Sequence, residues 1–294
     1  MNIRKRISFI FVVVFLLSVT TAFSAGHEKK DAVKNGILLV TFGTSVPEAE
    51  KSFEHIGKKV KEAFPNVDVR WSYTSFIIRK KLAKEGKMID SPEIALAKMM
   101  DEGFTHVAVQ SLHMMPGFEY EDLFKNARLF SEMAGGIQKI ACGSPLLMHH
   151  EDFEKTVEAA LSILPSERGK DDAIVFMGHG THHPSNAVYA ALMYEFWKKD
   201  KNIFVGTVEG SPDIEDIKVL LLEKNIKKAY LIPLMSVAGD HARNDMAGDE
   251  PDSWKSILSS AGITCVPVLK GLAEYDAFAG IWVDHLKKAM KNLE

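Results

Sequence analysis

Cysteine is scarce in this sequence, and an excess of positive charge is absent. Cys142 and Cys265 are the two cysteines among 294 residues, so one disulfide at most can form. The net charge is −3 at pH 7, and the pI is near 6.4. Without a basic excess, the chain lacks the electrostatic footprint of a nucleic-acid-binding protein. Its apolar content of 46% and charged content of 26% are those of a globular protein with a sizeable core.

The sequence also lacks an apolar stretch that would span a membrane comfortably. The main apolar run, residues 7–19, is shorter than the roughly 18–20 residues that cross a bilayer. Basic residues 4–6 precede this run, and small residues follow it, an order typical of a secretory signal. We therefore expect a signal peptide at residues 1–24, an N-terminal tail at residues 25–35, and a periplasmic mature protein without a stable membrane anchor. The alternative is an uncleaved N-terminal anchor, with the folded part exported in either case.

Strand and helix patterns alternate from Gly36 to the C-terminus. Continuous apolar runs such as Gly36–Phe42 and Ala173–Met177 are typical of parallel strands that are buried on both faces. Stretches between such runs have helical periodicity, and one of them opens with Ser91 as N-cap and Pro92 at the first helical position. This alternation predicts an α/β fold with parallel sheets and right-handed crossovers.

The two halves of the sequence repeat one another. ILLVTFGTS from Ile37 matches IVFMGHGTH from Ile174, and the segment ending at Gly117 matches the one ending at Gly239. The repeat predicts two similar doubly wound parallel-sheet domains with a cleft between them, at residues 36–165 and 166–294. It also places the two cysteines on equivalent strands of separate domains, where we expect buried free thiols instead of a disulfide.

Three residues of metal-ligand type follow three strands of the second half. His179 comes after the first strand, Glu209 after the second and His241 after the third, each with a glycine within two residues. Ligands of parallel α/β sheets bind beyond the carboxyl ends of the strands, so these side chains should meet in one crevice. Two imidazoles and one carboxylate suit a divalent metal ion. The glycines should let the backbone come close to a ligand.

Other histidines are weaker candidates, because a lone histidine is more often structural or solvated. His182 and His183 share the loop of His179 and could be outer ligands, proton carriers or a helix N-terminal feature before Pro184. His113, with two methionines after it, follows the third strand of the first half, where the favoured interpretation is the lining of an apolar crevice. Phe42 stands in the first half where His179 stands in the second.

Long motifs of the chain resemble those of the CbiK-type sirohydrochlorin cobaltochelatases of anaerobic cobalamin biosynthesis. The resemblance runs from about Gly36 to the C-terminus. It rests on LLVTFGTS at Leu38, YTSFIIRKKL at Tyr73, MGHGTHHPSN at Met177, VEGSPD at Val208 and PLMSVAGDHARNDMAGDEPDSW at Pro233. It implies the fold of the class II chelatases, with two α/β domains that hold a tetrapyrrole between them. The signal peptide is a departure, because cobalamin synthesis is usually cytoplasmic.

The same resemblance implies a function and a set of site residues. The family's metal ligands, a His, a Glu and a His, fall on His179, Glu209 and His241. The implied reaction is the insertion of Co²⁺ into sirohydrochlorin with release of two protons, and the two imidazoles are the expected bases. Sirohydrochlorin carries many carboxylates, and four residues are candidates to bind it: Arg79, Lys80, Arg243 and His113.

Other functions remain open at this point. A periplasmic haem-binding or metal-binding protein would also have two α/β domains and a signal peptide. A ferrochelatase that acts on sirohydrochlorin would share the same ligands. A hydrolase has little support, because the sequence contains no G-x-S-x-G nucleophile elbow. The sequence does not decide whether haem is bound as well, or whether the protein is a homo-oligomer.

Overall fold

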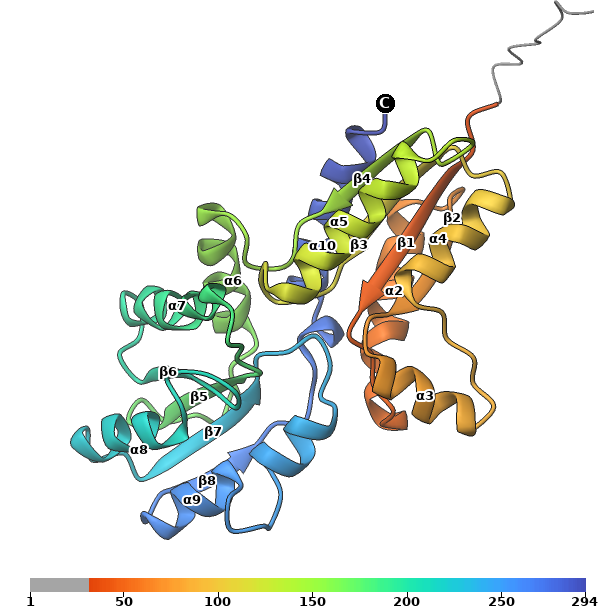
Figure 1. Ribbon diagram of the computed structural model, residues 1–294. Coiled ribbons are helices and arrows are strands. Elements are labelled where there is room, and N and C mark those ends of the chain that lie inside the picture. Colours follow the sequence, from red (N-terminus) through yellow and green to blue (C-terminus); the bar gives the residue numbers. More distant parts are fainter. Residues whose placement is uncertain (1–31) are drawn as a thin grey trace, which may run out of the picture. The chain divides into compact units, whose positions relative to one another are not determined.

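The computed structural model describes residues 32–294, and Lys34–Glu294 form one compact unit (Figure 1). The predicted signal peptide and most of the predicted tail lie outside the described residues. Both therefore stay predictions. Among the described residues, no helix combines the length and the apolarity needed to cross a membrane.

Two four-stranded sheets form the framework, and every strand pairing within them is parallel. The first sheet has the order β2-β1-β3-β4 and the second the order β6-β5-β7-β8. The strands are β1 (Asn35–Thr41), β2 (Asp68–Tyr73), β3 (His106–Ser111), β4 (Lys139–Gly143), β5 (Ala173–Gly178), β6 (Ile203–Thr207), β7 (Lys228–Pro233) and β8 (Thr264–Pro267). The two sheets have the same topology, so the fold class predicted from the internal repeat is confirmed.

Helices join the strands and cover the sheets. The α-helices are α2 (Glu50–Ala63), α3 (Phe76–Lys84), α4 (Pro92–Asp101), α5 (Phe118–Glu132), α6 (His150–Ser162), α7 (Ala187–Trp197), α8 (Ile214–Glu223), α9 (Trp254–Ser260) and α10 (Asp276–Lys291). Short 3₁₀ turns lie at η1 (Pro47–Ala49), η2 (Pro184–Asn186) and η4 (Leu272–Glu274), and η3 (Ala242–Met246) is a π-helical turn. Ser91 caps α4 as predicted, since its side chain accepts a hydrogen bond from the N–H of Ile94.

Burial on both faces explains why the strands read as continuous apolar runs. Along β1, Ile37 and Leu39 pack into a core that extends through the second sheet. The intervening Leu38 and Val40 face a separate core on the other side of the first sheet, under α4 and α5. All four side chains are fully buried. Successive side chains of a strand point to opposite faces of the sheet, so one apolar run contributes residues to two cores.

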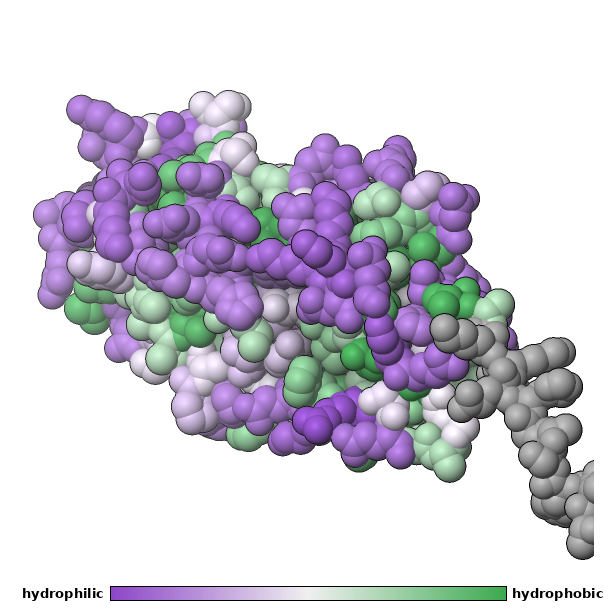
Figure 2. Space-filling model, turned by 90° about the horizontal axis from the view of Figure 1, so that it is seen from above, coloured by the Kyte–Doolittle hydropathy of each residue, from purple (hydrophilic) through white to green (hydrophobic). Residues whose placement is uncertain are grey.

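The closing helix of the chain does not stay with the second sheet. Helix α10 packs against β3 and β4 of the first sheet, while α6 contacts α7 of the second half (Figure 1). Lys139 on β4 also donates hydrogen bonds to the backbone carbonyls of Leu293 and Glu294. The domain boundary expected between residues 165 and 166 stays a prediction, and packing contacts cross it. Figure 2 shows a mostly hydrophilic surface on the face that it presents.

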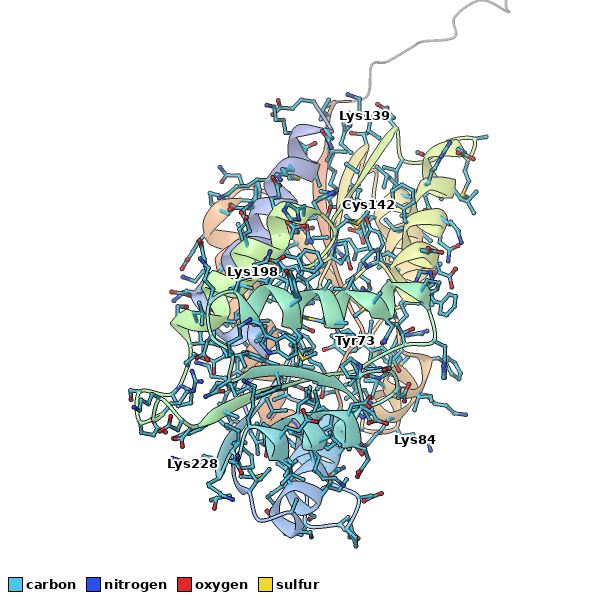
Figure 3. All side chains as sticks on the ribbon, turned by 90° about the vertical axis from the view of Figure 1, so that its left-hand side faces the viewer. Tyr73, Lys84, Lys139, Cys142, Lys198 and Lys228 are labelled. Carbon is cyan, nitrogen blue, oxygen red and sulfur yellow. The ribbon has the colours of Figure 1, made fainter. Side chains whose placement is uncertain are left out.

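Both cysteines are free thiols, as predicted, although each is half-buried and not fully buried. Cys142 lies on β4 (Figure 3), and Cys265 lies on β8, the equivalent strand of the second sheet. Burial raises the pKa of the Cys142 thiol to about 12 and that of Cys265 to about 11.

The raised pKa values predict slow alkylation of the native protein. At pH 8 only about 10⁻³ to 10⁻⁴ of either thiol is the reactive thiolate. Iodoacetamide at this pH should leave both cysteines of the folded protein unmodified for hours, whereas the urea-unfolded protein should take up two labels within minutes. Intact-mass spectrometry would count the labels. Rapid labelling of the folded protein would contradict the assigned burial.

Candidate metal centre

The three predicted ligands lie at the carboxyl ends of three adjacent strands. His179 follows β5 directly, Glu209 follows β6, and His241 ends the segment after β7. Strand β5 pairs with both β6 and β7, so the three following loops are neighbours. One ligand atom from each side chain lies within 4.8 Å of the others. In the described part of the chain this is the one group of three His, Cys, Asp or Glu side chains that comes so close.

Glycines allow the His179 loop to take its position. A Cβ atom on Gly178 would lie 2.2 Å from the ring of Tyr189, which packs beneath the loop. Gly180 has a positive φ of 84°, and a Cβ there would lie 2.7 Å from the backbone of Glu209. The expectation that these glycines bring backbone close to a ligand stays a prediction. They make room for a buried ring and for the neighbouring loop.

Tyr189 supports the same loop from below. Its side chain is almost fully buried, and its hydroxyl accepts a hydrogen bond of 3.4 Å from the N–H of Gly180. Burial raises the pKa of Tyr189 to about 12, so the hydroxyl stays neutral. The backbone adds a direct link between the two ligand loops, because the N–H of Glu209 donates to the carbonyl of His179 at 2.7 Å.

Hydrogen bonds fix which nitrogen each imidazole offers to a metal. Nδ1 of His179 lies 2.9 Å from the carbonyl oxygen of Gly180, which can only accept, so Nδ1–H is the donor. Nδ1 of His241 lies 2.6 Å from a carboxylate oxygen of Asp245 and donates in the same way. Each ring therefore keeps its Nε2 lone pair for a ligand. The two rings meet edge to face, with centroids 4.6 Å apart.

Asp245 was not predicted as part of the site. It lies in the π-helical turn η3 that begins immediately after His241, and this turn brings residue 245 under the imidazole of residue 241. A carboxylate behind a metal-binding histidine fixes the ring and makes it a stronger base. The spacing of four residues in HARND was the available signal, but it has this meaning only if the segment is helical.

The three side chains of the cluster are partly exposed to solvent. The side chains of His179, Glu209 and His241 are 38%, 55% and 32% exposed. A closed four-ligand cage would hold a metal permanently, whereas three accessible ligands leave room for a partner that takes the metal away. The arrangement can therefore hold a divalent ion and also release it.

The other histidines have different roles. His183 is a helix N-terminal feature, because its Nδ1 accepts from the N–H of Ser185. Its Nε2 lies 3.3 Å from Glu121 on α5. His182 is exposed in the same loop and is not among the three clustered ligands. His113 is largely buried at the end of β3, where Ser111 Oγ lies 2.8 Å from its Nδ1.

The predicted substrate-binding cations lie on two separate elements. Arg79 and Lys80 are on α3, and Arg243 is in η3, two residues after His241. Nε of Arg79 and Nε of Arg243 are buried, and neither has a hydrogen-bond partner among the described residues. Lys80 is exposed, with Nζ 5.9 Å from the ring centre of Phe76.

Phe42 is a neighbour of the site that the sequence did not single out as functional. Its ring centre lies 6.3 Å from that of His179, and 41% of the residue is exposed. It follows β1 as His179 follows β5, so the repeat places two equivalent positions face to face. An exposed aromatic ring beside the candidate metal ligands provides an apolar surface at an otherwise polar site.

The family model described as cobalt chelatase (CbiK) matches residues 35–291, nearly the whole described chain. The chain belongs to this cobalt chelatase family. A relative from Nitratidesulfovibrio vulgaris, named sirohydrochlorin cobaltochelatase CbiKC, is 44% identical over 89% of this chain and 92% of its own length. The sirohydrochlorin cobaltochelatase of Salmonella typhimurium is 36% identical over 88% of this chain and 97% of its own.

Solved structures agree on the fold of this CbiK-family chain. The sirohydrochlorin chelatase SirB from Bacillus subtilis subspecies spizizenii, in complex with cobalt, superposes with a TM-score of 0.59 at 13% identity. This match covers 88% of the present chain and 97% of the SirB chain. The structure of CbiX, from the biosynthesis of sirohaem in denitrifying bacteria, has a TM-score of 0.53 at 16% identity and covers 86% and 99%. At these identities the likeness concerns the fold alone.

Proposed function

We propose that the protein is a sirohydrochlorin cobaltochelatase, which inserts Co²⁺ into sirohydrochlorin and releases two protons. The observation that carries the proposal is the cluster of His179, Glu209 and His241, whose ligand atoms lie within 4.8 Å of one another at the carboxyl ends of adjacent strands. The names and the extensive identity of the two relatives support the choice of metal and tetrapyrrole. The two cobaltochelatase relatives support Co²⁺ as the substrate metal, and haem is not part of the proposal.

The geometry suggests how metal and protons are exchanged. Nε2 of His179 and Nε2 of His241 bind Co²⁺ together with Glu209. As each pyrrole nitrogen bonds to cobalt, it loses its N–H proton, and a histidine that has released the metal accepts that proton on Nε2. Two histidines thus match the two protons that must leave. The carboxylate of Asp245, 2.6 Å from Nδ1 of His241, stabilises the imidazolium that forms.

The carboxylates of the macrocycle need cationic partners in the protein. Arg243 lies two residues from His241, and its Nε is buried without a partner among the described residues, as is that of Arg79. A buried guanidinium N–H without an acceptor costs free energy until a ligand satisfies it. Arg79 and Arg243 are therefore assigned to substrate carboxylates, with Lys80 and His113 as weaker candidates.

The deciding experiment is a turnover assay. The purified protein is mixed anaerobically with an excess of sirohydrochlorin, and the absorption spectrum is followed after addition of Co²⁺, Fe²⁺ or Ni²⁺. Many turnovers per protein, fastest with Co²⁺, are expected. Faster turnover with Fe²⁺ would replace the proposal by a sirohydrochlorin ferrochelatase. A change that stops after one equivalent would indicate a binding protein without chelatase activity.

We also propose that the protein is exported to the periplasm after removal of residues 1–24. The basis is the sequence alone, with basic residues 4–6, the apolar residues 7–19 and the small residues that follow. Osmotic-shock fractionation of the source cells, followed by N-terminal sequencing of the recovered protein, tests this proposal. Recovery with the cytoplasmic fraction, or with an intact N-terminus, would argue against it.

A further inference from the structure

We infer that Asn186 is a positioning residue for metal binding, because it ties the loop of His179 to the loop of Glu209. Its side-chain oxygen accepts a hydrogen bond of 3.1 Å from the N–H of Thr181, two residues after His179. Its side-chain nitrogen donates to the carbonyl of Ser211, two residues after Glu209, at 2.6 Å. One amide side chain thus joins two of the three ligand loops. The inference rests on the proposed function, since the shared purpose of these loops is to hold the metal.

The Asn186 side chain and the two loops that it joins are closely packed. The three atoms that a Cβ on Gly210 would meet first all belong to the Asn186 side chain, the nearest being Oδ1 at 2.4 Å. A Cβ on Gly180 would meet the backbone of Glu209 and Gly210 at 2.7 Å. The two loops therefore lie against one another, and the space between them accepts the Asn186 amide only because position 210 has no side chain.

The metal ligands depend on such a link because they lie on loops. The Glu209 side chain is 55% exposed, so packing holds it only weakly, and its place relative to His179 follows the loop backbone. Residues that orient metal ligands without touching the metal usually contribute about 10- to 100-fold in affinity. Loss of the Asn186 amide should therefore lower Co²⁺ affinity and change the ligand arrangement while the fold persists.

The test compares Asn186→Ala with a matched control, Asn202→Ala. Asn202 also donates its side-chain N–H to a backbone carbonyl of a neighbouring loop, that of Lys170, but it lies before β6, at the opposite end of the sheet. Co²⁺ is titrated into each full-length protein, with calorimetry for affinity and the visible d–d bands for ligand geometry. Asn186→Ala should weaken Co²⁺ binding by about 10- to 100-fold and shift these bands, whereas Asn202→Ala should match the wild type.

Gly210→Ala is an independent variant that should disturb the hydrogen bonds of Asn186 from the Glu209 loop. Gly210 is not among the residues with positive φ, so alanine fits the backbone there, and its Cβ should displace the Asn186 side chain. Gly210→Ala alone should weaken Co²⁺ binding as Asn186→Ala does. In the double variant the added methyl group has no amide to meet, so the second substitution should have little further effect. Additive losses would contradict the inference.

The outcomes separate this inference from the proposed function. If wild-type protein binds Co²⁺ and metallates sirohydrochlorin while Asn186→Ala keeps the wild-type affinity and spectrum, Asn186 is not a positioning residue and the proposed function stands. If the wild type neither binds nor inserts Co²⁺, the proposed function is wrong, and the inference about Asn186 is wrong with it. A parallel loss of affinity in Asn202→Ala would show a general loss of stability and would overturn the specific role of Asn186.

Discussion

Replacing His241 by alanine should reduce cobalt insertion by about 10²- to 10⁴-fold while leaving the protein folded. The imidazole supplies a metal ligand and also the base that accepts a pyrrole proton, so one substitution removes both. The side chain is 32% exposed, and its polar contact is with Asp245, so its loss leaves no cavity in the core. The insertion rate is measured by initial rates of the sirohydrochlorin assay. Co²⁺ titration measures the loss of metal affinity, and circular dichroism of the same sample shows whether the protein stays folded.

His150→Ala is the control for this prediction. His150 is an exposed histidine at the first turn of α6 and is not part of the three-residue cluster. It should retain wild-type turnover and Co²⁺ affinity. Glu209→Gln, which keeps the shape but loses the charge, should weaken Co²⁺ binding without altering the fold. Turnover of His241→Ala within a factor of three of the wild type would remove His241 from the proposed mechanism.

The three ligands could be predicted from sequence because the argument needed only the order of strands. In a parallel sheet all carboxyl ends lie at one edge, so residues that follow neighbouring strands must approach one another. The internal repeat added a comparison: residues of ligand type are concentrated in the second half, and Phe42 stands in the first half where His179 stands in the second. The structure places one ligand atom of each within 4.8 Å of the others. Their role as metal ligands stays a prediction until it is measured.

The supporting residues could not be predicted in the same way. Asp245 reaches His241 only because five residues form a π-helical turn, and Asn186 reaches Ser211 only because two loops pack together. Neither interaction has a periodicity that a linear pattern could show. The packing of α10 on the first sheet was missed for a similar reason. Its apolar face predicts burial but does not say against which sheet.

A second large effect, on the stability of the fold, is expected at the pair of Asp152 and His285, which is not part of the metal centre. Asp152 on α6 and His285 on α10 are 0% and 2% exposed, with 3.0 Å between carboxylate oxygen and Nε2. The other ring nitrogen lies 3.1 Å from the carbonyl oxygen of Ser144, so each ring nitrogen has an acceptor within hydrogen-bond distance. The structure therefore contains a buried histidine–carboxylate pair that joins two helices.

Asp152→Ala should lower the free energy of unfolding by about 3–5 kcal/mol, because it leaves the buried His285 without its carboxylate partner. It also removes the acceptor for the N–H groups of Met148 and His149, at 3.2 and 2.8 Å. Urea unfolding at pH 7, followed by circular dichroism, measures the change. The unfolding midpoint should fall well below that of the wild type.

The same pair should make stability depend on pH on the acid side. Burial alone would raise the pKa of Asp152, but hydrogen bonds from the backbone N–H of His149 and from His285 outweigh it and hold this pKa below the ordinary value of 3.8. The folded protein therefore takes up this proton at a lower pH than the unfolded chain. The contribution is fully present above the ordinary carboxyl pKa and is lost as the pH falls through the lowered one. The difference in unfolding free energy between wild type and Asp152→Ala should accordingly shrink below pH 3.8.

Asp284→Ala, on α10 next to His285, is the matched control. Its carboxylate pairs with Lys287 at 2.9 Å, but it is 56% exposed, and exposed ion pairs contribute about 0–1 kcal/mol. It should unfold nearly as the wild type does at pH 7 and below. If Asp152→Ala were no less stable than Asp284→Ala, the buried pair would not be what joins α6 to α10, and the apolar contacts of α10 with α6 and the first sheet would have to hold that helix alone.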